Sequence, residues 1–486
     1  MDRSEWKTRI PNQTEVLILG GGITGISLAA LLDSNGKSVL LVEKGDFASG
    51  TSQASGMMVW GGLLYLKNLE FGLVRRFCRA RDRLIRKSGG EIETRSFTYL
   101  GLKSGGRNRL FMWLALQFYQ MLSLWQRAPV RDFPLDRLCP TLDKRLFKNG
   151  WTYEEGFLGS SDSRFALEQL PAGEDKAMNY CEVLEIRKKP QGEGFIATIK
   201  NTLSGEEAEV HTRKIVNCGG VWAEEINRRH GVPTEHTHHL SKGVYLLLPA
   251  PQNREALIMD MGTHGDTLCW VPWGEVVMWG PTETSIESLD QAHADTADID
   301  FLLAKLNDYS TKTWTREDIV NVRCGVRPLA KKPGQKVTHP LDLSRRGLVE
   351  KAPNQPWWTV FGGKLSGAAD LATEIYHALF GEMPARIETR VPSRKIPHID
   401  AFFGGRSLPD PAYCRDFECC RTLEDYLRRR TNLAQWIPHG GFGANFEYEA
   451  DLMAIAGILL DDPAAAEPAV RHYQEKVTME KRRWHE

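Results

Sequence analysis

The sequence lacks an excess of charge of either sign. Lys and Arg together number 62, and Asp and Glu also number 62. No net electrostatic field therefore draws the chain toward a polyanion. This balance excludes a strongly basic nucleic-acid-binding protein, so we expect no nucleic-acid partner.

The sequence also lacks an apolar run long enough to cross a bilayer, which needs about 20 residues. The longest such stretch, 110–125, has sixteen residues and includes two glutamines. It predicts a helix that is either buried, or a lid over a pocket, or a peripheral membrane contact aided by its aromatic residues and by Arg109 and Arg127. Residues 1–11 contain acids and no apolar core of a secretory signal. We expect a cytoplasmic protein, with peripheral attachment to the inner face of a membrane as the alternative.

Cysteine is sparse and odd in number, with nine residues scattered along the chain. That favours reduced thiols over a disulfide framework. The cluster of Cys414, Cys419 and Cys420 has no second pair at zinc-ligand spacing. His236 and His238 share one strand face, which permits a metal site, but no acid or cysteine partner is evident at metal-ligand spacing. We therefore expect no metal site.

A glycine-rich turn follows the first apolar run of the chain. Residues 16–19 are continuously apolar, as in a buried parallel strand. Gly20, Gly22 and Gly25 then form the pattern G-x-G-x-x-G. These glycines permit a tight turn, a close approach of the backbone to a pyrophosphate, and close packing of helix on strand. The free N–H groups at the start of the helix attract phosphate.

A second apolar strand, 38–42, ends at Glu43, where a carboxylate should hydrogen-bond a ribose hydroxyl. Strand, glycines, helix, strand and acid together predict a Rossmann-type dinucleotide site. The acid favours FAD or NAD over NADP. The residues after Glu43 are small, and 51–66 contains no charged side chain. Small side chains let backbone N–H and hydroxyl groups reach a pyrophosphate and a ring without steric conflict.

Further segments, in the same order along the chain, resemble the FAD-dependent glycerol-3-phosphate dehydrogenases of the D-amino-acid oxidase (DAO) superfamily. The resemblance covers nearly the whole chain. It is carried by residues 51–66, 156–167, 179–186, 214–226, 241–249, 270–273, 325–330, 360–372 and 421–433.

The resemblance implies an α/β fold with a Rossmann-type FAD-binding domain of the glutathione-reductase-like, DAO type. An antiparallel-sheet substrate domain and a C-terminal helical module accompany it. FAD should be bound without a covalent link, because 51–66 has no histidine or cysteine. The implied FAD-binding residues are Gly20, Gly22, Ile23, Thr24, Glu43, Lys44, Thr51, Ser52, Ser55, Gly61, Gly62, Val183, Cys218, Gly219, Trp222, Gly325, Arg327, Gly362, Gly363, Lys364 and Leu365.

The substrate site departs from the family's pattern. Where the family has His-Gly-Gly-Leu-Arg-Tyr-Leu, this chain has Trp60 in place of the histidine and Leu64 in place of the arginine. Tyr245 replaces a further histidine of the family. Arg327 and Lys364 are retained. Leucine cannot clamp a phosphate as arginine does, and a single arginine suits a carboxylate.

Two other arginines, Arg323 and Arg75, are alternatives for a second cation in the substrate site. Arg327 should fix the substrate anion, and Lys364 should polarise flavin or substrate oxygen. The base is Tyr245 or Lys364, or no discrete base acts because the substrate is an amine.

We expect an FAD-dependent dehydrogenase or oxidase in which hydride passes from a small anionic hydroxy compound to flavin N5. An amine or amino-acid oxidase, or a biosynthetic tailoring dehydrogenase with a non-phosphate substrate, is the alternative, favoured by Trp60 and Leu64. Retention of Arg327 and Lys364 argues against a non-catalytic FAD-binding protein. The electron acceptor is quinone or oxygen, and a homodimer is an open alternative to a monomer.

The length of 486 residues predicts more than one core. Thr422 and Asp425 form a capping pattern at the start of a predicted helix, and the run Arg428 to Arg430 ends that helix. We expect these arginines to form either a solvated helix end or an interdomain contact. The expected domains are the FAD-binding domain at 1–105, 150–225 and 320–387, the substrate and lid domain at 106–149 and 226–320, and the C-terminal helical module at 388–486.

Overall fold

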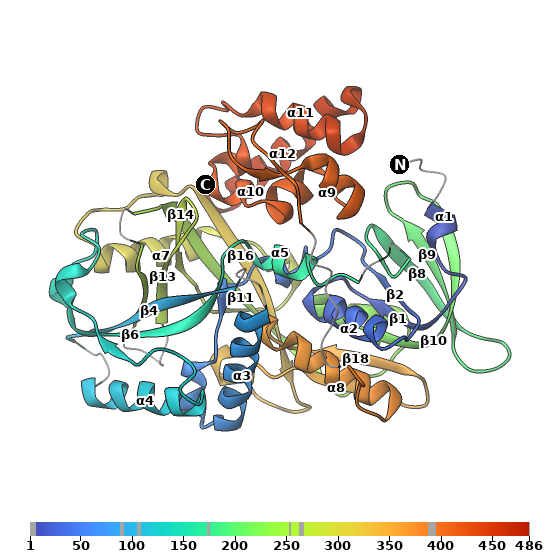
Figure 1. Ribbon diagram of the computed structural model, residues 1–486, viewed down its shortest axis with the longest axis horizontal. Helices are drawn as coiled ribbons and strands as arrows, with labels where there is room; N and C mark the ends of the chain where they lie inside the picture. Colours follow the sequence, from blue (N-terminus) through green and yellow to red (C-terminus); the bar gives the residue numbers. More distant parts are fainter. Residues whose placement is uncertain are drawn as a thin grey trace.

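The structure is a computed structural model of the chain. It describes residues 6–87, 92–104, 108–171, 173, 175–251, 254–261, 267–386 and 395–485, without the side chains of Leu64, Lys67, Asn68 and Leu341. Two β-sheets lie on either side of the molecule, and helices of the C-terminal part lie across one end of both (Figure 1).

The first sheet has a parallel centre in the order β18-β10-β1-β2-β7. The predicted strands at 16–19 and 38–42 are confirmed as β1 and β2. The strands β8 and β9 extend β10 antiparallel, and β17 closes the opposite edge. The bounds are β1 Gln13–Leu19, β2 Val39–Val42, β7 Ala177–Met178, β8 Cys181–Lys188, β9 Phe195–Asn201, β10 Glu207–Asn217, β17 Leu348–Lys351 and β18 Trp357–Phe361.

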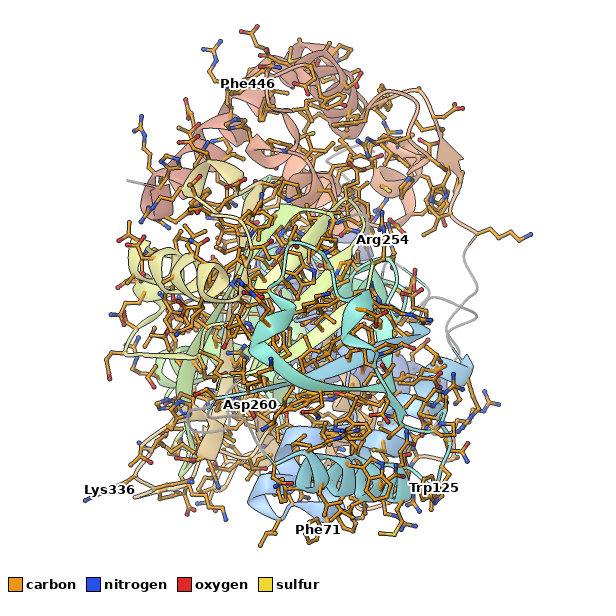
Figure 2. The ribbon with its side chains drawn as sticks, turned by 90° about the vertical axis from the view of Figure 1, so that its left-hand side faces the viewer. Phe71, Trp125, Arg254, Asp260, Lys336 and Phe446 are labelled. Carbon is orange, nitrogen blue, oxygen red and sulfur yellow. The ribbon has the colours of Figure 1, made fainter. Side chains whose placement is uncertain are left out.

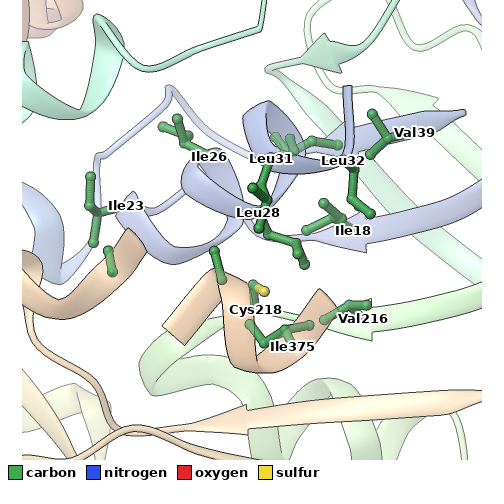
Figure 3. Close-up of a cluster of buried hydrophobic side chains, with 14 of the residues drawn as sticks. Ile18, Ile23, Ile26, Leu28, Leu31, Leu32, Val39, Val216, Cys218 and Ile375 are labelled. Atoms are coloured by element: carbon green, nitrogen blue, oxygen red, sulfur yellow. The ribbon is translucent and has the colours of Figure 1, made fainter. Parts of the chain in front are cut away.

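Two helices, α2 (Ile23–Ser34) and α8 (Ala368–Phe380), pack on one face of this sheet. Figure 3 shows Ile18 of β1 close to Leu32 of α2, and Val216 of β10 beside Ile375 of α8. Almost every position of α2 is buried, because strand and helix cover it on opposite sides. Burial of each large aliphatic side chain contributes about 1.5–3 kcal/mol. This core fixes the glycine turn that precedes α2.

The second sheet is largely antiparallel, in the order β15-β11-β14-β13-β12-β4-β6-β3, with β16 paired to β11 and β5 paired to β6. Helix α7 (Thr296–Tyr309) packs against it. The bounds are β3 Met58–Val59, β4 Ile92–Leu102, β5 Arg131–Asp132, β6 Phe147–Leu158, β11 Thr237–Pro249, β12 Ala256–Asp260, β13 Thr267–Trp273, β14 Val276–Gly280, β15 Thr284–Ile286 and β16 Asn321–Lys331.

The second sheet also contains strands from segments that the sequence assigns to the FAD-binding domain. The strands β3, β4, β6 and β16 lie in segments that the sequence assigns to the FAD-binding domain at 1–105, 150–225 and 320–387. They pair instead with strands of the substrate sheet. The alternation of residues along a strand shows which face is buried but not which strand pairs with it, so this pairing could not be predicted from the sequence.

Helices α3 (Phe71–Lys87) and α4 (Arg109–Leu122) lie together at the end of the molecule opposite the C-terminal helices (Figure 1). The predicted helix at 110–125 is therefore confirmed. Asn108 caps α4, because its side chain accepts hydrogen bonds from Leu110 N and Phe111 N. One side of α4 is buried against the second sheet, and the other side is exposed.

The C-terminal part has its own core around Tyr426, Leu452 and Ile455. Thr422 and Asp425 exchange side-chain and backbone hydrogen bonds, as the capping pattern predicts. The bounds are the π-helical segment Asp425–Arg430, α9 Pro411–Phe417, α10 Leu433–Trp436, α11 Glu449–Leu460, α12 Ala466–His485 and the pair β19 His398–Ile399 and β20 Leu408–Pro409. The remaining α-helices are α1 Trp6–Arg9, α5 Asp162–Leu167 and α6 Ala223–Arg229.

The arginine run joins this part to the first sheet. Arg429 and Arg430 are buried, and both pair with Asp46, three residues after Glu43. The interdomain contact is thus the correct alternative, and the solvated helix end is wrong for these two residues. Among the helices that the structure describes, all are too short or too polar to cross a bilayer.

Candidate active site

A cavity of about 1090 Å³ lies where the two sheets meet. The residues that end or follow β1, β2, β10 and β18 line one part, and residues of β11 and β16 line another. The carboxyl ends of parallel strands are where open α/β sheets bind ligands. The volume exceeds the range of about 300–1,000 Å³ that is usual for one small ligand, and it suits a dinucleotide together with a substrate.

The glycine turn fits the pyrophosphate of FAD. Gly20 has φ of +109°, and a Cβ there would lie 2.6 Å from Cys218 O. Gly22 precedes α2 and offers no side-chain cap to the first helical N–H groups. Ile23 N donates to Ser52 Oγ, and the other N–H groups at the start of α2 form the kind of anion site that a helix end offers. The turn can therefore pack closely on Cys218 and still present backbone donors to a pyrophosphate.

Glu43 also stabilises the backbone of the glycine turn, which the sequence did not predict. Its Oε2 accepts a hydrogen bond from Gly21 N at 2.7 Å, and its Oε1 accepts one from Gly45 N at 2.8 Å. Burial raises the pKa of this carboxyl, although both backbone bonds oppose the rise. Each oxygen keeps a further lone pair, so the carboxylate can shape the turn and still accept from a ribose hydroxyl.

The hydroxyl groups of the next segment tie it to its surroundings. Ser52 Oγ accepts from Ile23 N at 3.0 Å, and Thr51 Oγ1 donates to Val326 O at 2.7 Å. The small residues at 51–55 therefore bring α2 and β16 against one wall of the cavity.

Most of the predicted site residues come together in this cavity. Those that line it are Gly20, Gly22, Ile23, Thr24, Glu43, Lys44, Thr51, Ser52, Ser55, Trp60, Val183, Cys218, Gly219, Trp222, Tyr245, Arg327, Gly362, Gly363, Lys364 and Leu365. The side chain of Leu64 lies outside the described residues.

Three predicted glycines are not among the lining residues, and packing accounts for each. A Cβ on Gly61 would lie 2.2 Å from Tyr119 Oη, so the close approach is that of helix α4. Gly62 has φ of +88° and lies against the ring of Tyr65. A Cβ on Gly325 would lie 2.6 Å from Ala54 Cβ.

At the other end of the cavity two arginines converge on one carboxylate. Arg327 Nη1 lies 3.1 Å from Glu283 Oε2, and Arg345 Nη2 donates to Glu283 Oε1 at 3.3 Å. Ser241 Oγ also donates to Glu283 and lies 3.3 Å from Arg327 Nη1. Burial alone would raise the pKa of Glu283, but Arg327 and Arg345 outweigh it and lower the pKa.

Sequence reasoning missed Arg345 and Glu283. Its two candidates for a second arginine lie elsewhere, since Arg323 is buried in an ion pair with Asp162 and Arg75 is exposed on α3. Glu283 did carry a signal, because it follows the buried strand β14 closely, as Glu43 follows β2.

Lys364 lies among aromatic rings at the flavin end. Its Nζ donates to Trp60 O at 3.0 Å and lies 5.5 Å from the ring centroids of Trp60 and Tyr65 and 4.9 Å from that of Phe77. Burial of the ammonium group lowers the pKa of Lys364 to about 8. This lysine can therefore hold or release a proton near neutral pH.

Tyr245 lies in β11 with its hydroxyl against Gly56, where a Cβ would lie 2.5 Å from Tyr245 Oη. Burial raises the pKa of its phenol. The hydroxyl thus keeps its proton near neutral pH and can donate a hydrogen bond.

The histidines at 236 and 238 have acid partners from distant segments. His236 Nδ1 lies 2.9 Å from Glu350 Oε2, and His238 Nδ1 lies 3.4 Å from Glu224 Oε1. Within the described ranges, no group of three or more His, Cys, Asp or Glu side chains is arranged to hold a metal ion.

Comparison with known proteins identifies several relatives. Glycerol-3-phosphate dehydrogenase 2 of Mycobacterium tuberculosis (strain ATCC 25618 / H37Rv) is 28% identical over 406 residues, 82% of this chain and 68% of that protein. D-erythritol 1-phosphate dehydrogenase of Brucella abortus (strain 2308) is 29% identical over 382 residues, 76% of this chain and 74% of that protein.

Solved structures share the fold. The glycerol-3-phosphate dehydrogenase of Bacillus halodurans, complexed with FAD, has a TM-score of 0.72 at 18% identity and covers 97% of this chain and 95% of its own. The sequence model of the FAD dependent oxidoreductases (DAO) matches residues 15–363. The predicted DAO-type fold is therefore confirmed, and the chain belongs to the family of FAD dependent oxidoreductases.

Proposed function

We propose that this FAD-dependent oxidoreductase is a dehydrogenase of a small hydroxy compound that carries a phosphate group. The observation that carries the proposal is the convergence of Arg327 and Arg345 on Glu283. An internal carboxylate lies where two guanidinium groups meet, and a substrate anion can take its place. Two arginines suit a dianion, because each can form charge-assisted hydrogen bonds to a phosphate.

Displacement of Glu283 would also free its carboxylate to accept hydrogen bonds from substrate hydroxyls. The names of the two relatives above fit such a substrate, since glycerol 3-phosphate and D-erythritol 1-phosphate are both polyol phosphates. Trp60, Tyr65 and Tyr245 supply an aromatic wall for the carbon chain of the substrate.

Bound FAD supplies the acceptor for the hydride from the substrate carbon. The residues around the glycine turn and Glu43 would hold it, with the aromatic segment and Lys364 at its flavin end. Lys364 takes the proton of the substrate hydroxyl, because its pKa of about 8 leaves part of the amine neutral near neutral pH. Tyr245 donates a hydrogen bond and keeps its proton.

The amine or amino-acid oxidase remains as the second candidate. The loss of an arginine at Leu64 favoured it, but Arg345 supplies a second cation from another segment. An anionic hydroxy compound is therefore the better fit to the charges of the cavity.

The first test mixes the FAD-loaded protein, without oxygen, with glycerol 3-phosphate, 2-hydroxy acids, amino acids and amines, and follows bleaching of the flavin absorbance. We expect saturable bleaching by a phosphorylated polyol. Exchange of Arg345→Met should raise the half-saturating concentration roughly 10- to 100-fold, because a charge-assisted hydrogen bond contributes about 1.5–3 kcal/mol.

The matched control is Arg346→Met, whose side chain is 63% exposed and which should leave the half-saturating concentration unchanged. Equal half-saturating concentrations for the two variants would contradict the proposal that Arg345 binds the substrate phosphate. Bleaching by amines or amino acids alone would establish the second candidate instead.

We also infer a peripheral membrane contact and a quinone acceptor, with oxygen as the alternative acceptor. The exposed side of α4 and its neighbours is apolar and aromatic and carries Arg109 at one end, as in helices that lie on bilayers. Figure 2 places Phe71 and Trp125 at this end of the molecule. The exposed apolar residues are Leu69, Phe71, Leu110, Phe111, Trp113, Leu114, Met121, Leu124 and Trp125.

A further inference from the structure

A single peptide group lies between a lysine and a glutamate. The carbonyl oxygen of Trp60 accepts a hydrogen bond from Lys364 Nζ at 3.0 Å. The N–H of Gly61, which belongs to the same peptide group, donates to Glu155 Oε2 at 3.2 Å. An ammonium group and a carboxylate thus act on opposite ends of one peptide dipole, and each polarises it in the same direction.

Glu155 lies in β6, and its side chain is fully buried. Arg81 Nη1 donates to Oε2 at 2.8 Å, and Tyr119 Oη donates to Oε1 at 2.5 Å. Arg81 also pairs with Asp82 at 2.9 Å. The carboxylate is therefore held by helices α3 and α4 and has little freedom to turn away from Gly61.

A buried ion pair does not by itself account for this arrangement. Apolar side chains of similar volume are often as stable as a buried ion pair. Here the carboxylate also reaches the backbone of the segment that carries Trp60, a lining residue of the cavity. Its position beside that segment points to a role in the site.

The charges around Lys364 single out Glu155. The groups that face the ammonium are Glu155 of β6, Arg345, Tyr65 of the 3₁₀-helix at 63–68, and Cys78 and Arg81 of α3. Burial raises the pKa of both the Cys78 thiol and the Tyr65 phenol, so both stay neutral near neutral pH. Arg345 and Arg81 disfavour the ammonium form. Glu155 is the charged member of this set that favours it, because the Cys78 thiol is neutral.

We propose that Glu155 is a positioning residue, which acts through the Trp60–Gly61 peptide to hold the Lys364 ammonium at its place in the cavity and to favour the protonated form. The inference rests on the proposed function only in that FAD occupies the cavity and Lys364 lies beside its flavin. It does not depend on which substrate is oxidised.

The test measures the midpoint potential of the bound flavin against pH in the FAD-loaded protein, without substrate. A cation beside the flavin stabilises reduced flavin, so loss of the lysine proton should change the slope of the curve. We expect this break near pH 8 in the wild type, the value to which burial lowers the pKa of Lys364. Glu155→Gln keeps an acceptor for Gly61 N but removes the charge, so the break should move down by roughly one pH unit.

The matched control is Glu154→Gln, the same substitution one residue earlier in β6, where the side chain accepts from Ala128 N. Its curve should coincide with that of the wild type. Lys364→Met should abolish the break, and addition of Glu155→Gln to Lys364→Met should change nothing further. Three results would each overturn the proposal. They are a break in Glu155→Gln at the same pH as in the wild type, the absence of a break in the wild type, and a further change when Glu155→Gln is added to Lys364→Met.

Tyr119→Phe gives a second test if Glu155→Gln does not fold. It removes the hydroxyl that donates to Glu155 Oε1 and leaves more negative charge on the carboxylate. The break should then move to higher pH, opposite to the shift in Glu155→Gln. An unchanged or lowered break in folded, FAD-loaded Tyr119→Phe would contradict the role of Glu155.

Discussion

Lys364 lines the cavity and has contacts on several sides. It lies beside three aromatic rings, and it donates to the backbone of Trp60. Aromatic faces hold the ammonium form without neutralising it, and the carbonyl of Trp60 can accept a hydrogen bond from either the ammonium or the neutral amine. A lysine that keeps its position while its charge changes is suited to transfer of a proton.

We predict that the limiting rate of flavin bleaching by substrate rises with pH and levels off above about 8. The base is the neutral amine, and the fraction of it grows as pH passes the pKa of Lys364. Lys364→Met should lower the rate roughly 10²- to 10⁴-fold and remove this rise. Stopped-flow absorbance across the pH range measures both effects.

The control for this prediction is Lys351→Met, an exposed lysine in β17. It should keep both the rate and its pH dependence. A rise through pH 8 that persists in Lys364→Met would assign the proton transfer to another group.

The residues that sequence could and could not predict differ in a physical way. Gly20, Gly22 and Glu43 act within one strand–helix–strand unit, where spacing along the chain determines geometry. Arg345 and Glu155 reach the cavity or its wall through pairings between distant segments. No local pattern marks such a residue, so its role appears only in three dimensions.

At the scale of elements, α4 is a helix with two different sides. Its buried side, with Met112, Leu116 and Tyr119, packs on the second sheet, and Tyr119 reaches Glu155. Its exposed side is apolar too, although solvent would favour polar residues there. The apolar content of this segment predicted the helix from the sequence. Whether the helix is buried in the core or lies at the surface depends on the elements that pack against it, which the sequence does not show.

We predict that Leu110→Glu combined with Phe111→Glu weakens binding to vesicles of anionic phospholipid by at least about tenfold. These side chains are 63% and 60% exposed, and each buried apolar side chain of this size contributes about 1.5–3 kcal/mol. Co-sedimentation measures the binding. Flavin bleaching by substrate in solution should not change.

Leu203→Glu is the comparison variant, because Leu203 is 57% exposed in the turn after β9, which belongs to the other sheet. It should bind vesicles as the wild type does. If wild-type protein stays in the supernatant at all lipid concentrations, the membrane contact is wrong and oxygen becomes the favoured acceptor.

At the scale of the whole molecule, Asp46 connects the first sheet with the C-terminal part. Its carboxylate accepts from Arg429 Nε at 2.5 Å, from Arg430 Nη2 at 3.0 Å and from Asn179 Nδ2 at 3.0 Å. Burial would raise the pKa of Asp46, but the two arginines outweigh it and lower the pKa. The parallel sheet and the helical C-terminal part could be predicted from the sequence. The contact of Asp46 with Arg429 and Arg430 could not, because a run of arginines does not indicate which acidic residue pairs with it.

We predict that Asp46→Ala lowers the free energy of unfolding by about 3–5 kcal/mol, because it leaves two arginines buried without their counter-charge. It should also weaken retention of FAD, since Gln53 of the segment 51–55 accepts from Arg429. Urea unfolding followed by flavin fluorescence measures both. Glu467→Ala, which breaks the exposed pair with Arg471, should change stability by no more than about 0.5 kcal/mol. Equal losses in the two variants would refute the role of Asp46.

The contact between Asp46 and the arginine run also sets an order of events during biosynthesis. A ribosome completes the glycine turn and Glu43 hundreds of residues before it reaches Arg429 and Arg430, and N-terminal parts fold first as a chain emerges. Until those arginines arrive, the segment after Glu43 carries an aspartate with no counter-charge from them. We therefore expect FAD to be incorporated only after Arg429 and Arg430 have been synthesised, and ribosome-bound chains that stop short of Arg429 to remain colourless.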